Sequence, residues 1–410
     1  MFDQLTIPDW ILLGALLGVF IAQIYWYSRY LAAPARKLRR SAKTNEQMVN
    51  DQMVNVPGVS VILCAHNESE NLSNYLQALL TQDYPEYEVI VVDDGSEDET
   101  RATIERYMIR DPRLHMTFVL FGARVGSTKK LALTLAAKAA KYDYLLLTDA
   151  DCVPESNQWI REMMKGFEEG KDIVLGFSPY FAEEGHVNRL IRFDTLFNGL
   201  HYLGAALCGH PYMGVGRNLA YRKAMFFESG GFTHLMNNKA GDDDLFVNHV
   251  ATKTNTAVVL TRESYTWTPS KKTMAEWLQQ KRRHVSVSPA YRGETKFRLA
   301  LEPISRGLFY GLVIAIIALQ VMAFATRWNA GECAFQWTDV VPILMLYLPL
   351  LIALGLFVIR WIVQTAILNV SARRMGLRKF NMFSILWFDI VLPLVNLWML
   401  AVPKRNNKKW

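Results

Sequence analysis

The sequence predicts an α/β domain that is held at a membrane by apolar helices at both ends of the chain. Short apolar runs alternate with amphipathic stretches in the middle of the chain, and long, nearly uncharged apolar runs lie near its two ends. Of the 410 residues, 51% are hydrophobic and 20% are charged, so the composition excludes a disordered chain.

The middle of the chain predicts a parallel sheet covered by helices, an α/β doubly wound core. Short, nearly continuous apolar runs are typical of strands buried on both faces, and four of them are present: Val59–Ala65, Glu88–Val92, Met116–Leu120 and Tyr144–Thr148. Amphipathic stretches at Asn71–Leu80 and Lys130–Lys141 lie between them. Strands that alternate with helices favour parallel pairing.

Three apolar runs are long enough to cross the ~30 Å hydrocarbon core of a bilayer. They are expected at Trp10–Ala32, Gly307–Ala325 and Val340–Ile359. Basic residues follow the first and third runs, so the positive-inside rule predicts an integral inner (cytoplasmic) membrane protein with its central domain in the cytoplasm.

The last apolar stretch, Phe383–Val402, is harder to interpret. It contains Asp389 and Pro393, and a full crossing would place four basic residues near the C-terminus on the outer side. A charge and a helix breaker favour a re-entrant or interfacial hairpin, while a further crossing stays open.

The charge balance favours a membrane partner over nucleic acid. The chain has 45 Lys and Arg against 38 Asp and Glu, a net charge of +7, and the basic residues cluster beside the apolar runs. The 4 cysteines show no metal-binding or disulfide spacing, which suits a reducing compartment.

Polar residues follow three of the predicted strands, where an open α/β sheet binds ligands. They are His66-Asn67-Glu68, Asp93-Asp94 and Asp149-Ala150-Asp151. Such a carboxylate cluster binds sugar or ribose hydroxyls, or a hard cation such as Mg²⁺ or Mn²⁺. Each motif by itself also fits a turn or a helix cap.

Two further motifs carry residues suited to ligand binding or to proton transfer. Gly126-Ser127-Thr128-Lys129-Lys130 opens a predicted helix and suits an anionic ligand. Asp242-Asp243-Asp244 offers a general base whose pKa a neighbouring carboxylate would raise, although acidic residues at a helix start also complement the helix dipole.

Together these motifs, over about Pro57–Arg292, resemble the family 2 glycosyltransferases of the GT-A fold, in the membrane-bound branch that includes polysaccharide synthases and lipid glycosyltransferases. The resemblance implies an N-terminal transmembrane helix (1–32), a basic linker (33–56), a GT-A catalytic domain (57–273), an amphipathic interfacial segment (274–306) and a C-terminal membrane region (307–410). It also implies a divalent metal, Mg²⁺ or Mn²⁺.

The resemblance implies roles for individual residues. The catalytic base is Asp243, with Asp242 beside it, and the metal is held by Asp151 with Asp149. The residues implied to bind the donor are His66, Asn67, Glu68, Asp94, Lys129, Asp149, Gln280 and Arg283. The residues implied to form the acceptor region are Gly214, Gly216, Asn218 and His284.

One departure from the family pattern bears on the product. The QxxRW motif ends here in His284 in place of Trp, which removes an aromatic platform for the acceptor sugar and argues against a processive enzyme. The expected reaction is an inverting, in-line transfer of one sugar from a UDP-linked donor to a lipid or lipid-linked glycan. A processive polysaccharide synthase is the alternative enzyme, and a catalytically silent membrane scaffold that binds nucleotide sugar is the alternative of another class.

Overall fold

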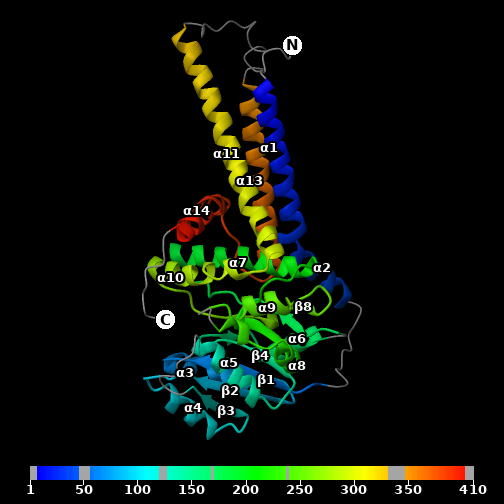
Figure 1. Cartoon of the computed structure of the whole chain (residues 1–410), viewed down its shortest axis with the longest axis vertical. Coiled ribbons are helices and arrows are strands. Elements are labelled where there is room, and N and C mark those ends of the chain that lie inside the picture. The colour runs from blue at the N-terminus through cyan, green and yellow to red at the C-terminus, as the bar shows by residue number, and fades with distance from the viewer. Residues whose placement is uncertain are drawn as a thin grey trace.

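An α/β domain lies at one end of a bundle of long helices in the computed structural model (Figure 1). The structure describes residues 7–45, 56–119, 127–167, 170–236, 240–330 and 347–401. The domain holds the predicted strand-end motifs, and the bundle is formed by the apolar runs from both ends of the sequence.

The central sheet has seven strands within the described residues, in the order β3-β2-β1-β4-β7-β6-β8. The strands are β1 (Val59–Ala65), β2 (Tyr87–Asp93), β3 (Leu114–Phe118), β4 (Tyr144–Leu147), β5 (Val153–Pro154), β6 (Ile173–Leu175), β7 (Leu219–Arg222), β8 (Thr256–Val258) and β9 (Thr266–Trp267). β5 and β9 form a separate antiparallel pair.

The sheet is mixed rather than parallel throughout, which corrects the sequence prediction. β1 to β4 are parallel to one another as expected, whereas β7 runs antiparallel to both β4 and β6. The chain reaches β7 from the carboxyl edge of β4, where Thr148 Oγ1 donates to the carbonyl of Arg217 at 3.1 Å. Because β7 starts at that edge, it can pair only in the reverse direction.

Helices cover both faces of the sheet. Those of the domain are α3 (Ser69–Leu80), α4 (Thr100–Met108), α5 (Thr128–Ala139), α6 (Trp159–Met164), α7 (His186–Leu207), α8 (Lys223–Glu228), α9 (Asp244–Val250) and α10 (Met274–Val285). Alternate residues of β1 face opposite sides: Val61 packs in the cluster that contains α3, α4 and α6, and Ile62 in the one that contains α5 and α7.

Three long helices form the bundle in Figure 1, namely α1 (Ile7–Trp26), α11 (Gly293–Asn329) and α13 (Leu348–Arg374). After α1 come the π-helical turn η1 (Tyr27–Leu31) and α2 (Ala33–Asn45). An apolar cluster that includes Leu16, Phe309 and Ala353 joins the three helices. Their outward side chains are mostly exposed and apolar, as a lipid-facing surface requires.

Four segments of the described chain are long and apolar enough to cross a membrane: Ile7–Ala42, Gly293–Asn329, Leu348–Arg374 and Met382–Met399. The predicted interfacial segment 274–306 is not one unit, because α10 ends at Val285 and α11 runs without a break from Gly293 into the second span, through Pro303. Cys333 and residues 340–346 of the predicted third span lie outside the described residues.

The last apolar stretch forms a single helix, α14 (Met382–Ala401), and not a hairpin. Pro393 cannot donate to the carbonyl of Asp389 one turn earlier, and Arg306 Nη1 donates to that oxygen instead, at 3.5 Å. Figure 1 shows α14 across the base of the bundle, and it contacts α7, α10 and α13. Its outward side chains, among them Phe383 and Trp387, are exposed and apolar.

A buried ionic cluster joins the helices at the base of the bundle. The carboxylate of Asp389 on α14 accepts hydrogen bonds from Arg306 at 2.9 Å, Arg360 at 2.9 Å, Tyr310 at 2.7 Å and Gln364 at 2.7 Å. The donors come from α11 and α13, so one side chain of α14 is tied to two helices of the bundle. This cluster explains how an Asp can lie in an apolar helix.

The domain and the bundle are packed tightly together through α7. The large apolar cluster of the domain continues from Leu203 of α7 to Tyr27 of η1, Leu368 of α13 and Phe388 of α14. A Cβ atom at Gly204 of α7 would lie 2.1 Å from the carbonyl oxygen of Tyr30, so only glycine allows this approach.

Candidate functional site

The predicted strand-end motifs meet at one edge of the sheet. β1, β2 and β4 are parallel neighbours, and the Asp94 amide donates to the carbonyl of Ala65 at 2.8 Å, which joins the ends of β1 and β2. The Asp149-to-Asp151 segment follows β4 at the same edge. The predicted convergence of these motifs is therefore confirmed.

The ends of β1 and β2 are held together by short polar contacts. His66 Nδ1 lies 2.7 Å from the carbonyl oxygen of Asp94, and the Asp94 carboxylate accepts from the Thr128 hydroxyl at 2.7 Å. Burial raises the pKa of Asp94 above its usual value. Asn67 adopts a left-handed conformation with φ of 57°, and its side-chain oxygen accepts from the amide of Glu97 at 2.8 Å. Asn67 thus shapes the loop after β1.

Lys129 connects two of the predicted motifs. Its ammonium lies 3.1 Å from Asp149 Oδ1 and 3.2 Å from Asp242 Oδ2. Burial alone would lower the pKa of Lys129, but Asp149, Asp242 and Asp243 raise it well above its usual value, so this lysine carries a positive charge. The helix that presents it, α5, begins with Ser127, whose side chain caps the Lys130 amide, while Gly126 lies outside the described residues.

Asp243 lies beside this ion pair at the start of α9. One carboxylate oxygen accepts from the Gly216 amide at 2.7 Å, and the other accepts from the Asp244 amide at 2.8 Å. Burial and then the Asp242 carboxylate raise the pKa of Asp243. Asp242 is different, because Lys129 outweighs its burial and lowers its pKa. Of these two carboxylates, Asp243 is thus the stronger proton acceptor, and it also caps α9.

Asp244 is buried next to Asp242 and Asp243, and Tyr291 contacts it. Its carboxylate accepts from the Tyr291 hydroxyl at 3.1 Å, and burial followed by the Asp243 charge raises its pKa to about 8. Tyr291 lies between α10 and α11. The base motif is therefore joined to the segment that leads into the second membrane helix.

A buried arginine that the sequence analysis did not assign lies behind the Asp149 and Asp151 pair. The guanidinium of Arg217 stacks on the Tyr180 ring at 4.6 Å, and its Nη1 atom has no partner among the described residues. Burial opposes its charge, but its neighbours, the two carboxylates among them, raise its pKa overall. Arg217 lies in the Gly-rich segment 214–222, which was the one available signal for it.

α10 presents the residues of the QxxRW-like motif. Gln280 donates to the Tyr180 hydroxyl at 3.2 Å, so it lies beside Arg217, and Arg283 and His284 are exposed on the same helix. Lys281 holds the helix to α7 through Asp194 at 2.6 Å.

The predicted acceptor region is only partly an open surface. Gly216 donates its amide to Asp243, while Gly214 is packed against Leu219 and Leu175. Asn218 is fully buried, and its amide nitrogen donates to the carbonyls of Phe177 and Ser264 at 2.8 Å each. The side chain of Asn218 therefore holds the segment from inside and does not face an acceptor.

The carboxylates near Asp151 could hold part of a metal site. Burial and then the charges of Asp151 and Asp149 raise the pKa of Glu68. Across the described ranges, no group of three or more His, Cys, Asp or Glu side chains is placed to hold a metal ion. A cation at Asp151 would need further oxygens, such as those of a diphosphate.

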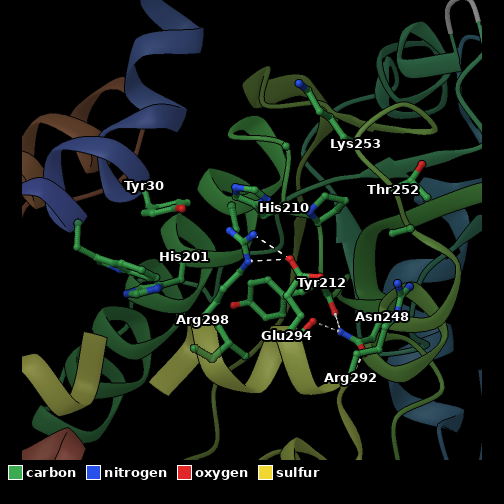
Figure 2. Close-up of a pocket in the computed structure, with 17 residues that line it drawn as sticks. Tyr30, His201, His210, Tyr212, Asn248, Thr252, Lys253, Arg292, Glu294 and Arg298 are labelled. Atoms are coloured by element: carbon green, nitrogen blue, oxygen red, sulfur yellow. Dashed lines mark hydrogen bonds and ion pairs between the residues drawn. The ribbon is translucent and has the colours of Figure 1, made fainter. Parts of the chain in front are cut away.

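A separate pocket of about 160 Å³ lies where α1, α7 and α11 meet the domain (Figure 2). It includes two buried ring nitrogens, Trp26 Nε1 and His201 Nε2, for which the described part of the chain offers no partner. Burial, followed by the charge of Arg306, lowers the pKa of His201 to about 3. The Tyr212 ring in this pocket packs edge-on against Tyr291 at 6.1 Å, so the pocket lies behind the base motif and does not include the carboxylates.

Comparison with known proteins gives a match to one family. Residues 60–230 match the model of the family described as Glycosyl transferase family 2. The mixed sheet and its covering helices are those of the GT-A fold. The mannosyltransferase PcManGT from Pyrobaculum calidifontis, solved in complex with GDP-Man and Mn²⁺, has this fold with a TM-score of 0.51 and 19% sequence identity, over 83% of this chain and 98% of that one.

Two curated relatives match part of the chain. The poly-beta-1,6-N-acetyl-D-glucosamine synthase of Staphylococcus epidermidis is 34% identical over 106 residues, which are 26% of this chain and 24% of that protein. The synthase of the same name from Staphylococcus aureus strain COL is 28% identical over 137 residues, 33% of this chain and 30% of that protein. The chain thus matches between a quarter and a third of the length of these relatives.

Proposed function

We propose that this chain is a membrane-bound inverting glycosyltransferase that moves one sugar from a UDP-linked donor to a lipid or lipid-linked glycan at the cytoplasmic face. The observation that carries the proposal is the position of Lys129, whose single ammonium pairs with Asp149 and with Asp242. This cation joins the motif implied to bind the donor to the motif implied to hold the base. The sugar donor and the catalytic base would therefore lie at the same place in the domain.

In the proposed reaction, Asp243 accepts the proton of the acceptor hydroxyl. The hydroxyl oxygen forms a bond to the anomeric carbon while the bond from that carbon to the diphosphate oxygen breaks, with inversion. Two backbone amides fix the Asp243 carboxylate, and its raised pKa suits a general base better than the lowered pKa of Asp242.

Positive charge near the leaving diphosphate would supply much of the catalysis, because it acts where negative charge develops. Lys129, Arg283 and the buried Arg217 are the candidate cations of the chain, with Gln280 as a hydrogen-bond donor. We propose that Asp151 and Asp149 hold a divalent metal, Mg²⁺ or Mn²⁺, which when bound supplies further positive charge for the diphosphate. Carboxylate oxygens suit either ion.

The membrane arrangement supports a lipid acceptor. We propose that α1, α11 and α13 cross the bilayer and that α14 lies in its cytoplasmic surface, since α14 lies across the base of the bundle and exposes Phe383 and Trp387. α10, which carries Arg283 and His284, contacts α14. The proposed acceptor side of the site would thus lie next to the lipid headgroups.

The test is nucleoside diphosphate release by the full chain in native-lipid membranes, over a panel of nucleotide sugars, with Mg²⁺ or Mn²⁺ against a chelator. We expect metal-dependent release with one uridine-linked donor, and its loss in Asp151→Ala and in Asp243→Asn. Release that is unchanged in both variants would refute the assigned roles. If no donor supports release but calorimetry detects nucleotide-sugar binding, the result favours the silent scaffold.

A processive synthase is the second candidate, because the curated relatives with up to 34% identity are polysaccharide synthases by name. The length of the product separates the two enzymes. We expect a labelled lipid whose mass increases by one sugar, whereas a ladder of masses would favour the synthase. His284, which stands at the Trp position of the family motif, favours the single transfer.

A further inference from the structure

A second, larger pocket lies at the base of the bundle, away from the carboxylates. Its volume is about 710 Å³, and it lies between the start of α7 and the connection from α13 to α14. Four cationic side chains line it: Arg189 and Arg192 from α7, and Arg378 and Lys379 from the connection. Arg192 and Arg378 are 186 positions apart in the sequence, so the pocket exists only in the folded chain.

The connection is fixed in shape. α13 ends at Arg374, and Gly376, with φ of 68°, follows its C-cap. The Leu377 amide donates to the carbonyl of Ala372 at 2.8 Å, as in a Schellman motif. Asn369 then holds the Phe380 backbone at both its amide (2.8 Å) and its carbonyl (2.9 Å). Arg378 and Lys379 are therefore presented from a defined loop.

Apolar packing holds this loop against α7. The Phe380 ring packs edge-on against Phe193 of α7 at 5.4 Å, and the guanidinium of Arg192 lies 5.6 Å from the centre of the same ring. These contacts of Phe380 help to bring four like charges together. Such an arrangement is unfavourable unless an anion completes it.

The positive charges in this pocket are only partly compensated within the described chain. Glu183 and Glu184 also line the pocket and offset two of the four charges, and among the described residues none of the four cations forms an ion pair. Burial, and then Arg378 and Arg189, lower the pKa of Arg192, as expected for a cation among cations. The lining keeps an excess of positive charge.

The N-terminal end of α7 adds to the positive potential in this pocket. α7 has 22 residues, and Gly185 at its N-cap, with φ of 108°, provides no capping side chain. Asn188 in the first turn accepts from the Glu183 amide at 3.1 Å, so it does not cap the helix either. The amides of this first turn and the positive end of the helix dipole therefore lie beside the four cations.

The pocket lies where a membrane surface would be. It opens at the corner between α13, a candidate span, and α14, whose exposed apolar residues begin with Phe383. From the four unpaired cations at this corner, we infer that the pocket binds the phosphate group of an anionic membrane lipid. The bound headgroup would bridge α7 of the domain to the connection between α13 and α14. This inference does not depend on the proposed transferase activity.

Binding of a short-chain lipid to the full chain in neutral detergent micelles tests the inference. Dihexanoyl phosphatidic acid is titrated calorimetrically, in parallel with dihexanoyl phosphatidylcholine and inorganic phosphate. We expect the anionic lipid to bind best, and the Arg378→Gln/Lys379→Gln variant to bind it about 25-fold more weakly, since each cation near an anionic surface contributes about fivefold. The Arg378→Lys variant, which keeps the charge, should bind it nearly as well as the unchanged chain.

The matched control removes the same charge at the far end of the domain. Arg101→Gln/Arg110→Gln changes α4 and the turn after it, which lie at the opposite end of the molecule from the bundle (Figure 1). Its lipid affinity should be unchanged, and unfolding curves of both double variants should match that of the unchanged chain. Equal lipid binding by the two double variants would overturn the inference. Equal affinity for inorganic phosphate and for the lipid would overturn the assignment to a lipid.

Discussion

The carboxylates at the sheet edge and the buried carboxylate of Asp389 differ in how completely neighbouring side chains neutralise them. Asp389 accepts from two arginines, a tyrosine and a glutamine, and is 1% exposed. At the sheet edge, a single ammonium is shared between Asp149, which is 33% exposed, and Asp242. Among the described residues, the Asp243 carboxylate has only backbone donors.

The difference separates charges that hold the fold from charges left free to react. A carboxylate with four side-chain donors has no capacity left for a proton or a ligand, and it fixes the helices that supply the donors. A carboxylate with few donors can accept a proton or a cation. We therefore expect substitutions in the two regions to affect different properties, stability in one and turnover in the other.

The largest expected effect is on stability, from Asp389→Asn. Arg306 and Arg360 would keep their buried charges without the carboxylate, and breaking such a pair costs about 3–5 kcal/mol of unfolding free energy. Unfolding of the purified chain in mixed micelles measures it. The control is Glu294→Gln, an exposed carboxylate paired with Arg298 on the same helix as Arg306, which should change stability by less than about 1 kcal/mol. Equal losses in the two variants would contradict the distinction.

The next effect is on turnover, from Asp243→Asn. If Asp243 is the base, loss of proton transfer should lower kcat by about 10²-fold or more, with the unfolding temperature nearly unchanged. Asp172→Asn, at a carboxylate paired with Arg222 outside the motifs, is the control and should keep its activity. A variant that loses stability but keeps turnover would show that Asp243 acts as a helix cap alone.

A smaller effect on turnover is expected from Lys129→Met. This change removes the ammonium that contacts Asp149 and Asp242. If the loss to the transition state equals one charge-assisted hydrogen bond, about 1.5–3 kcal/mol, kcat/KM should fall by about 10- to 100-fold. Lys138→Met, at an exposed position of the same helix, should leave kcat/KM unchanged. Lys129→Arg should recover part of the loss, because the charge is restored.

A further expected effect is a pH dependence of stability that comes from Asp244. Its pKa of about 8 in the folded chain exceeds the value near 4 of an unfolded Asp, so the folded state binds the proton more tightly. This contribution to stability is present below about pH 4 and is lost as the pH rises through about 8. Thermal unfolding from pH 5 to pH 8.5 should therefore show a decline in the unchanged chain that is weaker in Asp244→Asn. Parallel curves would contradict the raised pKa.

The sequence predicted the parallel half of the domain well, because local patterns determine it. β1 spans the predicted residues Val59–Ala65, and the motifs after β1, β2 and β4 meet because parallel strands end at one edge. Lys129 and the acidic pairs were found in the same way. The roles of these residues in catalysis stay predictions.

Other features could not be found from local patterns. Arg217 lies near Asp149 and Asp151 because β7 pairs in reverse with β4. The course of α14 depends on Asp389, whose partners at Arg306 and Arg360 are far away in the sequence. An isolated acidic residue and a proline favour a break, and the contacts that stabilise a continuous helix are tertiary.

The close approach at Gly204 has a further consequence. Because α7 touches the η1 backbone with no space for a Cβ atom, and the apolar cluster continues through this contact, the domain has no hinge here between itself and the first membrane helix. The carboxylates then stay at a constant height above the end of the bundle. In the proposed reaction, this fixed distance would select the acceptor. A suitable acceptor would need a matching distance between its membrane anchor and its reactive hydroxyl, as well as suitable chemistry.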